Sequence, residues 1–382
     1  MMPSNVSFFC TRVHRAKPHQ HASAYVNTVP RVPSTLHIAN STTIRYADGS
    51  VFEGQCSHEG MFHGLGKYKN ATSGDEYTGE FRSGSFHGAG HLWSKDGSTY
   101  DGEFAQGIKH GSGLQNYRDG SSFVGTWNLG LVEGYGEYRC ASGDVYKGEF
   151  ARGKKNGAGK LFYRDGGTFE GQWAEDHRQA GSGIMTLPNG DVYEGEFNRI
   201  GLYHGEGKLM HGESGDVYEG QFTDGKKHGL GSILYRESGD EYEGEWRKGT
   251  KTGQGKYAFA DGNSYEGDWI NDRMEGRGRY MYSSGDTYEG DFLLDQPHGQ
   301  GKATYANGDC YEGTFKGGLP CGKGTMTYHD GGGVWTGEWN KGVRVLVETA
   351  SAEENEEKAE EGAAKQEDEL TTSQESTTTN AE

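Results

Sequence analysis

Residues 239–257 read GDEYEGEWRKGTKTGQGKY, and this stretch decides the fold. Five of its nineteen residues are glycine, and three are the large aromatics Tyr242, Trp246 and Tyr257. Acidic residues alternate with the first two rings and Gly244, which is the period-two pattern of a β-strand. Gly244 falls between the two rings on one face and leaves a notch beside them. The following GKYAFADG predicts a second short strand ending on a DG turn, with Gly253 and Gly255 as the bend that starts it.

The same pattern recurs thirteen times, at intervals of 23, 24 or 25 residues. Each copy begins with an aromatic anchor that is followed two residues later by glycine. The anchors are Phe52, Tyr77, Tyr100, Phe123, Tyr146, Phe169, Tyr193, Tyr218, Tyr242, Tyr265, Tyr288, Tyr311 and Trp335. Phe or Trp stands four residues after the anchor in twelve copies, with Cys56 as the exception, and a G-x-G pair lies in each of the twelve intervals. The 66 glycines among 382 residues therefore mark a repeat architecture and not a low-complexity tract.

Residues 41–347, with these thirteen copies, resemble the MORN (membrane occupation and recognition nexus) repeat. One hairpin alone is marginal in water, so successive hairpins should pair and cover each other's rings. The predicted fold class is all-β: an elongated, twisted antiparallel sheet of tandem β-hairpins with disordered termini. Three parts are predicted: a basic disordered arm (1–40), the repeat array (41–347) and an acidic disordered tail (348–382).

Charge separates the candidate partner classes. The formal net charge is −18, and removing the tail's −10 and the arm's +4 leaves −12 on the repeats. Nucleic acid is therefore disfavoured as a partner, and an anionic membrane would repel the array. Only the basic arm could bind anionic lipid or serve as an organelle-targeting segment. No apolar run is long enough to span a membrane, and the start of the sequence lacks a secretory signal.

The sequence offers no catalytic constellation, cofactor loop or metal set. No GK is followed by Ser or Thr, so no P-loop is present, and the recurring G-x-G is architectural. Six histidines share one repeat position, which is filled elsewhere by residues as different as Ala180 and Glu133; this favours a structural role. They are His63, His87, His110, His204, His228 and His298. The five cysteines are scattered and predict no disulfide framework, although Cys310 and Cys321 could share a zinc ion across a dimer.

Two functions are weighed. The resemblance implies a non-catalytic scaffold of the cytoskeleton, since MORN proteins such as radial-spoke head proteins are similar. The expected location is the cytoplasm, on a cytoskeletal structure such as a cilium, a flagellum or a cell pole. The alternative is a membrane-associated, phosphoinositide-binding adaptor. Expected partners are proteins, bound as helical or extended segments in an aromatic groove. The predicted groove residues, chosen for their uninterrupted spacing, are Tyr242, Trp246, Tyr265, Trp269, Tyr288 and Phe292.

The C-terminal end of the array predicts a second contact. GVRVLVET places Val343, Val345 and Val347 on one face of a terminal strand. An exposed strand edge invites pairing, so this segment either caps the sheet or joins two copies as a homodimer.

Overall fold

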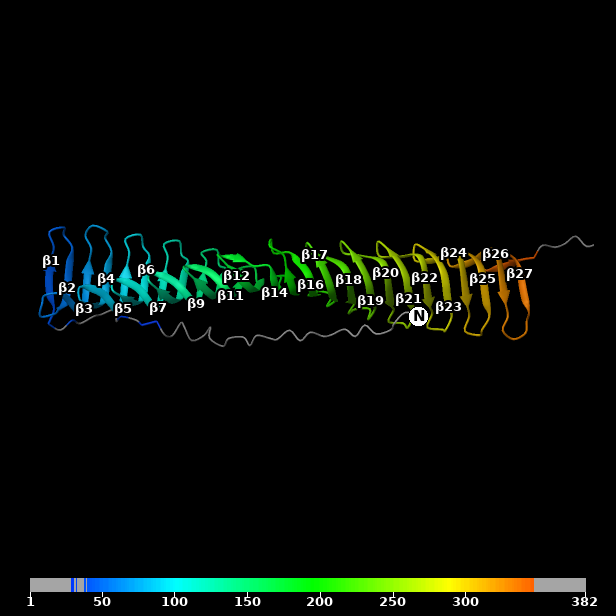
Figure 1. Ribbon diagram of the computed structural model, residues 1–382, viewed down its shortest axis with the longest axis horizontal. Coiled ribbons are helices and arrows are strands. Elements are labelled where there is room, and N and C mark those ends of the chain that lie inside the picture. The colour runs from blue at the N-terminus through cyan, green and yellow to red at the C-terminus, as the bar shows by residue number, and fades with distance from the viewer. Residues whose placement is uncertain (1–28, 31, 33–37, 39, 347–382) are drawn as a thin grey trace, which may run out of the picture. The chain divides into compact units, whose positions relative to one another are not determined.

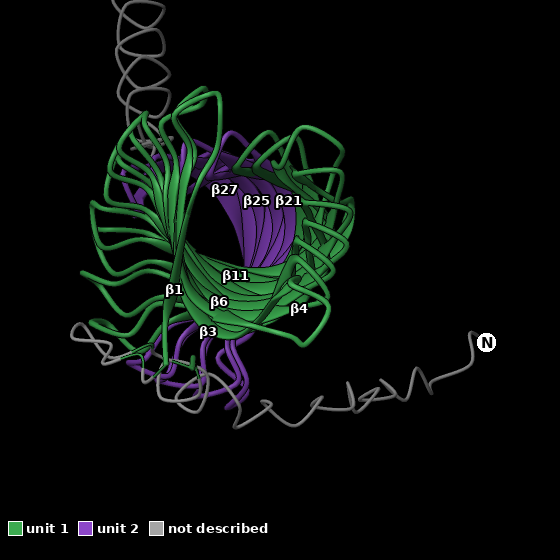
Figure 2. Ribbon diagram, turned by 90° about the vertical axis from the view of Figure 1, so that its left-hand side faces the viewer, with its two compact units in different colours: residues 1–250 green, residues 251–382 purple. Residues whose placement is uncertain are grey.

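The computed structural model describes residues 29–30, 32, 38 and 40–346. The tail predicted at 348–382, most of the arm predicted at 1–40, and Val347 lie outside these residues. The described chain contains strands and turns and no helix. It divides into two compact units, residues 1–250 and 251–382, which Figure 2 colours separately.

Unit 1 is an antiparallel sheet whose strands follow one another in chain order (Figure 1). Its strands are β1 (Thr42–Arg45), β2 (Val51–Cys56), β3 (Phe62–Lys69), β4 (Glu76–Arg82), β5 (Ser85–Trp93), β6 (Thr99–Ala105), β7 (Ile108–Asn116), β8 (Ser122–Asn128), β9 (Leu131–Arg139), β10 (Val145–Ala151), β11 (Lys154–Phe162), β12 (Thr168–Ala174), β13 (His177–Arg178), β14 (Gly181–Thr186), β15 (Val192–Phe197), β16 (Tyr203–Met210), β17 (Val217–Thr223), β18 (Lys226–Leu234) and β19 (Glu241–Arg247).

Unit 2 repeats the same arrangement, beginning one residue inside its first strand. Its strands are β20 (Thr250–Ala258), β21 (Ser264–Ile270), β22 (Arg273–Met281), β23 (Thr287–Leu293), β24 (Gln296–Thr304), β25 (Cys310–Lys316), β26 (Leu319–Thr327), β27 (Val334–Asn340) and β28 (Val343–Val345). The predicted all-β fold of tandem antiparallel hairpins is thus confirmed.

Two kinds of turn join the strands of each repeat. The anchor strand β10 turns into β11 through Arg152 and Gly153, whose φ angles of 52° and 84° suit a two-residue hairpin turn. The strand β11 reaches the next anchor strand through residues 163–167, closed by a hydrogen bond from the amide of Tyr163 to the carbonyl of Gly167 (2.9 Å). The DG dipeptide lies in this longer turn, as predicted, with Gly166 at φ 96°.

Glycines face one another across neighbouring strands and make room for the rings. Gly148 of β10 pairs with Gly159 of β11, which pairs in turn with Gly171 of β12. A Cβ atom added to Gly148 would lie 2.5 Å from the Cα of Gly159, and one added to Gly159 would lie 2.5 Å from Cζ of Tyr146. The anchor ring therefore lies flat over a pair of glycines, and the notch predicted at Gly244 is the general design of the repeat.

The first glycine of the G-x-G pair lies opposite a β-bulge in ten repeats. In the pairing of β21 with β22, the register shifts between Gly267 and Trp269. Gly276 of β22 lies opposite this shift and has a φ of 65°. The carboxylate of Asp268 accepts a hydrogen bond from the amide of Arg277 (2.8 Å) and so fixes the bulge. Gly253, with φ 60°, holds the same position in β20. Because β20 begins at Thr250, the predicted bend lies inside the return strand and not at its start.

Side chains also link successive repeats at both margins of the sheet. In the longer turns, Asp144 accepts a hydrogen bond from the amide of Arg164, twenty residues on (2.9 Å). At the tight turns, Asp295 accepts one from the amide of Met274 (2.8 Å). These contacts hold neighbouring hairpins in register, as nearest-neighbour stabilisation of a repeat array requires.

Candidate partner-binding surface

The aromatic face of the sheet is a closed core. The six residues predicted to line a partner groove all lie on it, with exposed fractions of 0–4%. Tyr242 and Trp246, in unit 1, meet edge to face with ring centroids 5.2 Å apart. In unit 2, the ring of Phe292 lies edge to face against Tyr265 (4.9 Å) and Tyr288 (5.1 Å), and Trp269 meets Tyr265 at 5.4 Å. These contacts are the favoured geometry of aromatic pairs and make the rings the core of the repeat.

A further side chain covers the anchor ring in many of the repeats. This lid position is the second residue after the tight-turn glycine, and its chemistry varies along the chain. Phe86 stacks on Tyr77 with centroids 3.8 Å apart, whereas Lys155 places its Nζ 5.3 Å from the ring centroid of Tyr146. In unit 2, Lys251 Nζ lies 4.7 Å from the centroid of Trp269. Stacking and cation–π contacts thus seal the aromatic face.

The buried anchor tyrosines donate hydrogen bonds to the backbone. Tyr193 Oη donates to the carbonyl of Glu196 (2.8 Å), and Tyr265 Oη donates to the carbonyl of Asp268 (2.9 Å). Burial raises the pKa of both phenols, and the charges of Glu196 and Asp268 raise it further. The phenols therefore stay protonated and remain hydrogen-bond donors at neutral pH.

The burial of these rings bears directly on the predicted groove. Contact between a partner and the six rings stays a prediction, but their surface is already used by each other and by the lids. A partner approaching this face would meet the lid side chains instead. The surface that remains available is the opposite, polar face of the sheet.

The polar face carries a row of cross-strand pairs one residue after each anchor. In unit 2, Glu266 pairs with Lys256 and with Arg279, and Glu289 pairs with Arg279. In unit 1, the Lys160 Nζ to Glu170 Oε2 distance is 3.2 Å, and Lys208 to Glu219 is 3.4 Å. Acidic and basic residues alternate across most of this row, so that their charges largely compensate each other.

The row is interrupted at one place in unit 1 by two neighbouring apolar residues. Leu114 of β7 pairs directly with Val124 of β8. Asp101 of β6 pairs with Leu114 on one side, and Glu137 of β9 pairs with Val124 on the other. We call this cluster of Asp101, Leu114, Val124 and Glu137 the apolar gap.

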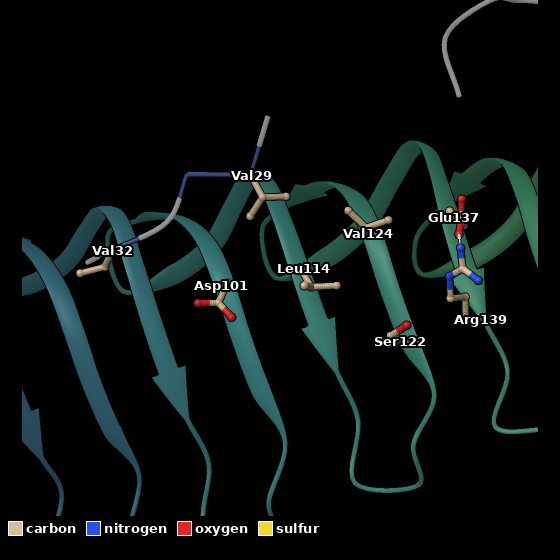
Figure 3. Close-up of a pocket in the computed structure, with 8 residues that line it drawn as sticks. All are labelled: Val29, Val32, Asp101, Leu114, Ser122, Val124, Glu137 and Arg139. Atoms are coloured by element: carbon tan, nitrogen blue, oxygen red, sulfur yellow. Dashed lines mark ion pairs between the residues drawn. The ribbon is translucent and has the colours of Figure 1, made fainter. Parts of the chain in front are cut away.

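Residues that precede the array lie over the apolar gap. A cavity of about 390 Å³ is lined by the four gap residues, by Ser122 and Arg139, and by Val29 and Val32 (Figure 3). Val29, Pro30 and Val32 are half-buried. Part of the arm predicted to be disordered thus contacts the array.

The rim of this cavity is charged and internally paired. Glu137 is the most enclosed of these groups, with its side chain 10% exposed. It forms an ion pair with Arg139 and another with Lys147, whose Nζ lies 3.0 Å from Oε2 of Glu137. Asp101 is paired with His91, 2.6 Å from its Nδ1. The cavity therefore has an apolar floor and an ordered, charged rim.

The histidine and cysteine candidates are spread along the described chain, and zinc binding by Cys310 and Cys321 across a dimer stays a prediction. The six histidines that share a repeat position are half-buried or exposed, and four of them pair across the sheet with carboxylic residues, as His87 does with Glu80. No group of three or more His, Cys, Asp or Glu residues suited to a metal is found within residues 40–346. Cys310 and Cys321 are both free thiols. No helix in the described part of the chain could cross a membrane.

The C-terminal edge is placed as the sequence predicts. Val343 and Val345 lie in β28, 67% and 41% exposed, and pair with Asn340 and Glu338 of β27. Arg344 points the other way, with its guanidinium 4.9 Å from the ring centroid of Trp335. Val347 lies outside the described residues. Self-association through this short strand stays a prediction, as does its alternative role as a cap.

Sequence comparison identifies the repeat. The family described as MORN repeat matches residues 57–74, 77–99, 100–122, 123–145, 146–168, 169–192, 193–212, 218–238, 242–264, 265–287, 288–310 and 311–333. These twelve tandem matches together cover more than half of the chain. None of the curated proteins matches it significantly.

Solved structures of distant sequence also resemble the chain. The TCP domain of Drosophila melanogaster SAS-4 in complex with a proline-rich motif of Ana2 is 13% identical, covering 42% of this chain and 85% of its own, with a TM-score of 0.28. The TCP10 domain of Danio rerio CPAP in complex with a peptide of Danio rerio STIL is 12% identical. That match covers 66% of this chain and 93% of the domain, with a TM-score of 0.26. Those two domains bind peptide segments of partner proteins. TM-scores this low do not establish a shared architecture with this chain.

Proposed function

Because this chain belongs to the MORN repeat family, we propose that it is a non-catalytic scaffold of the cytoskeleton that binds segments of partner proteins. The family supports the coarser part of this proposal, since MORN repeats suggest a protein-interaction scaffold. The finer part, a cytoplasmic location on a cytoskeletal structure such as the axoneme or base of a cilium, is our inference from the sequence resemblance.

One observation carries the proposal: the two faces of the sheet differ in what they can offer. The aromatic face is occupied by ring contacts and lids: twelve of the thirteen anchors are 0–2% exposed, and Trp335 is half-buried. The polar face presents the same row in repeat after repeat, and its side chains are accessible; Lys208 and Glu219, for example, are 54% and 69% exposed. A regular row of accessible side chains of this kind suits docking of extended segments and not the enclosure of a small substrate.

The proposal is tested by detergent extraction of cells that express the tagged full-length chain. We expect most of the chain to stay with the detergent-insoluble microtubule skeleton, because protein contacts on the polar face survive removal of membranes. A full-length Leu114→Asp, Val124→Asp variant should be largely released, since charge replaces the apolar floor. An Ile184→Asp variant, altered at the same row position in another repeat, should be retained. Complete release of the unaltered chain with the membrane lipids would contradict the scaffold and favour a membrane adaptor.

A further inference from the structure

The apolar gap is matched to the segment that lies over it. In the row of cross-strand pairs, Leu114 and Val124 are directly opposed apolar residues, whereas Ile184 lies between two acids, Glu170 and Glu194. A single apolar residue on a sheet surface needs no explanation, but two in contact form a small docking floor. The side chains of Val29 and Val32 line the cavity above that floor (Figure 3).

The contact is made by side chains and not by strand pairing. Val29, Pro30 and Val32 are not in a strand, and β6 to β9 are already paired on both sides. Pro30 has no amide hydrogen to donate and a fixed φ, so it favours an extended segment that needs no hydrogen-bonded neighbour. Contacts of this kind bury little surface and exchange readily.

Charge favours this segment over others in the chain. Residues 1–40 contain four basic residues, one of them Arg31 between the two valines, and no acidic residue. The repeats carry −12 overall, and the cavity rim holds the carboxylates of Asp101 and Glu137 together with the guanidinium of Arg139. The acidic tail has the opposite sign and would be repelled from the same place.

We propose that the segment around Val29–Val32 acts as an internal ligand of the apolar gap and competes there with partner segments of the same chemistry. Such a partner segment is extended, has two β-branched apolar residues three positions apart, and carries positive charge between or beside them. This inference rests on the proposed scaffold function and deepens it by naming the site and the kind of segment bound. A tethered segment has an effective concentration of about a millimolar. Even a low-affinity contact therefore keeps the apolar gap occupied until a partner segment competes for it.

The test uses the full-length chain and a fluorescein-labelled peptide of residues 26–38, VNTVPRVPSTLHI. Fluorescence anisotropy measures its binding to the unaltered chain and to a Val29→Asp, Val32→Asp variant, in which the internal segment no longer fits the apolar floor. We expect the variant to bind the peptide about tenfold more tightly than the unaltered chain, because the competitor has been removed. A peptide in which the valines at positions 29 and 32 are replaced by aspartate should not bind.

Two further changes locate the site. Leu114→Asp, added to the Val29→Asp, Val32→Asp variant, should abolish peptide binding, and Ile184→Asp added instead should leave it unchanged. Both residues are partly exposed on the polar face, and circular dichroism checks that each variant keeps its strands. The proposal is overturned if the peptide binds neither chain, if it binds both equally, or if Leu114→Asp leaves binding intact. Cytoskeletal retention without peptide binding would remove this proposal alone and leave the scaffold function standing.

Discussion

Replacing Gly159 by alanine is expected to destabilise its repeat by about 3 kcal/mol, because the added methyl group has no space. Its Cβ would lie 2.5 Å from Cζ of Tyr146, a ring that is itself fully buried. The ring cannot rise from the sheet, since Lys155 covers it and Trp173 packs edge to face against it with centroids 5.2 Å apart. Hydrogen exchange of the peptides that span β10 to β12 measures the local loss of stability.

Gly153 supplies the matched control for this experiment. It lies in the tight turn of the same repeat with φ 84°, and a Cβ atom there would meet nothing within 4 Å. Gly153→Ala therefore isolates the cost of the left-handed backbone, about 1 kcal/mol. If Gly159→Ala costs no more than Gly153→Ala, the glycine row does not serve to seat the rings.

Removing a whole anchor ring should have the largest effect on stability. Tyr193→Ala is expected to cost about 3–5 kcal/mol, the range for deletion of a buried aromatic side chain. Tyr193 stacks under Tyr203 at 3.8 Å and meets the edges of Phe197 and Phe222, both at 5.1 Å. Because Phe222 belongs to the next repeat, the loss should spread to that repeat, and faster hydrogen exchange should extend from β15 to β17.

Tyr193→Phe separates the ring from its hydroxyl. This change removes the hydroxyl's hydrogen bonds to the carbonyls of Glu196 (2.8 Å) and His204 (3.4 Å) and should cost about 1 kcal/mol. The chain itself places phenylalanine at the same position in three repeats, at Phe52, Phe123 and Phe169. A Tyr193→Phe variant as unstable as Tyr193→Ala would mean that the hydrogen bond, and not the ring, holds the repeat together.

The sequence predicted the fold well because its strongest signals repeat. Period-two alternation around Tyr242 and Trp246 predicted a strand, and an anchor strand is present in every repeat. Glycine at a fixed offset predicted the notch; in the other twelve repeats, a Cβ atom added to this glycine would lie within 3.0 Å of the anchor side chain. The tight turn at positions such as Arg152 and Gly153 was not predicted as a turn of its own. Glycine fills the second position of this turn in most repeats, but the first position varies and usually adopts a positive φ without being glycine, so that residue gives no turn signal.

The burial of the six proposed groove rings could not be read from spacing. Alternation places Tyr265 and Trp269 on one face, but it does not say what covers that face. Part of the cover comes from the lid position: Lys251 lies over the ring of Trp269, and Met274 and Pro297 hold the same position in the next two repeats of unit 2. No single residue type marks that position, although it always stands two residues after the turn glycine or its equivalent.

The apolar gap could not be predicted without knowing which residues pair across the strands. Leu114 and Val124 are ten residues apart and unremarkable singly; only the cross-strand pairing of β7 with β8 brings them together. The contact between Val29 and the array could not be read from the sequence for the same reason. The composition of the arm predicts disorder, and nothing in the residues around Val29 says that they meet strands some eighty residues further along the chain.

Photo-cross-linking from position 29 tests most directly whether the polar face receives extended segments. Val29 is replaced by p-benzoylphenylalanine in the full-length chain, which is irradiated, digested and analysed by mass spectrometry. The account predicts intramolecular cross-links to β7 and β8, centred on Leu114 and Val124, and their loss when Leu114 is changed to aspartate. Cross-links spread over other repeats, or joining only separate copies of the chain, would contradict it.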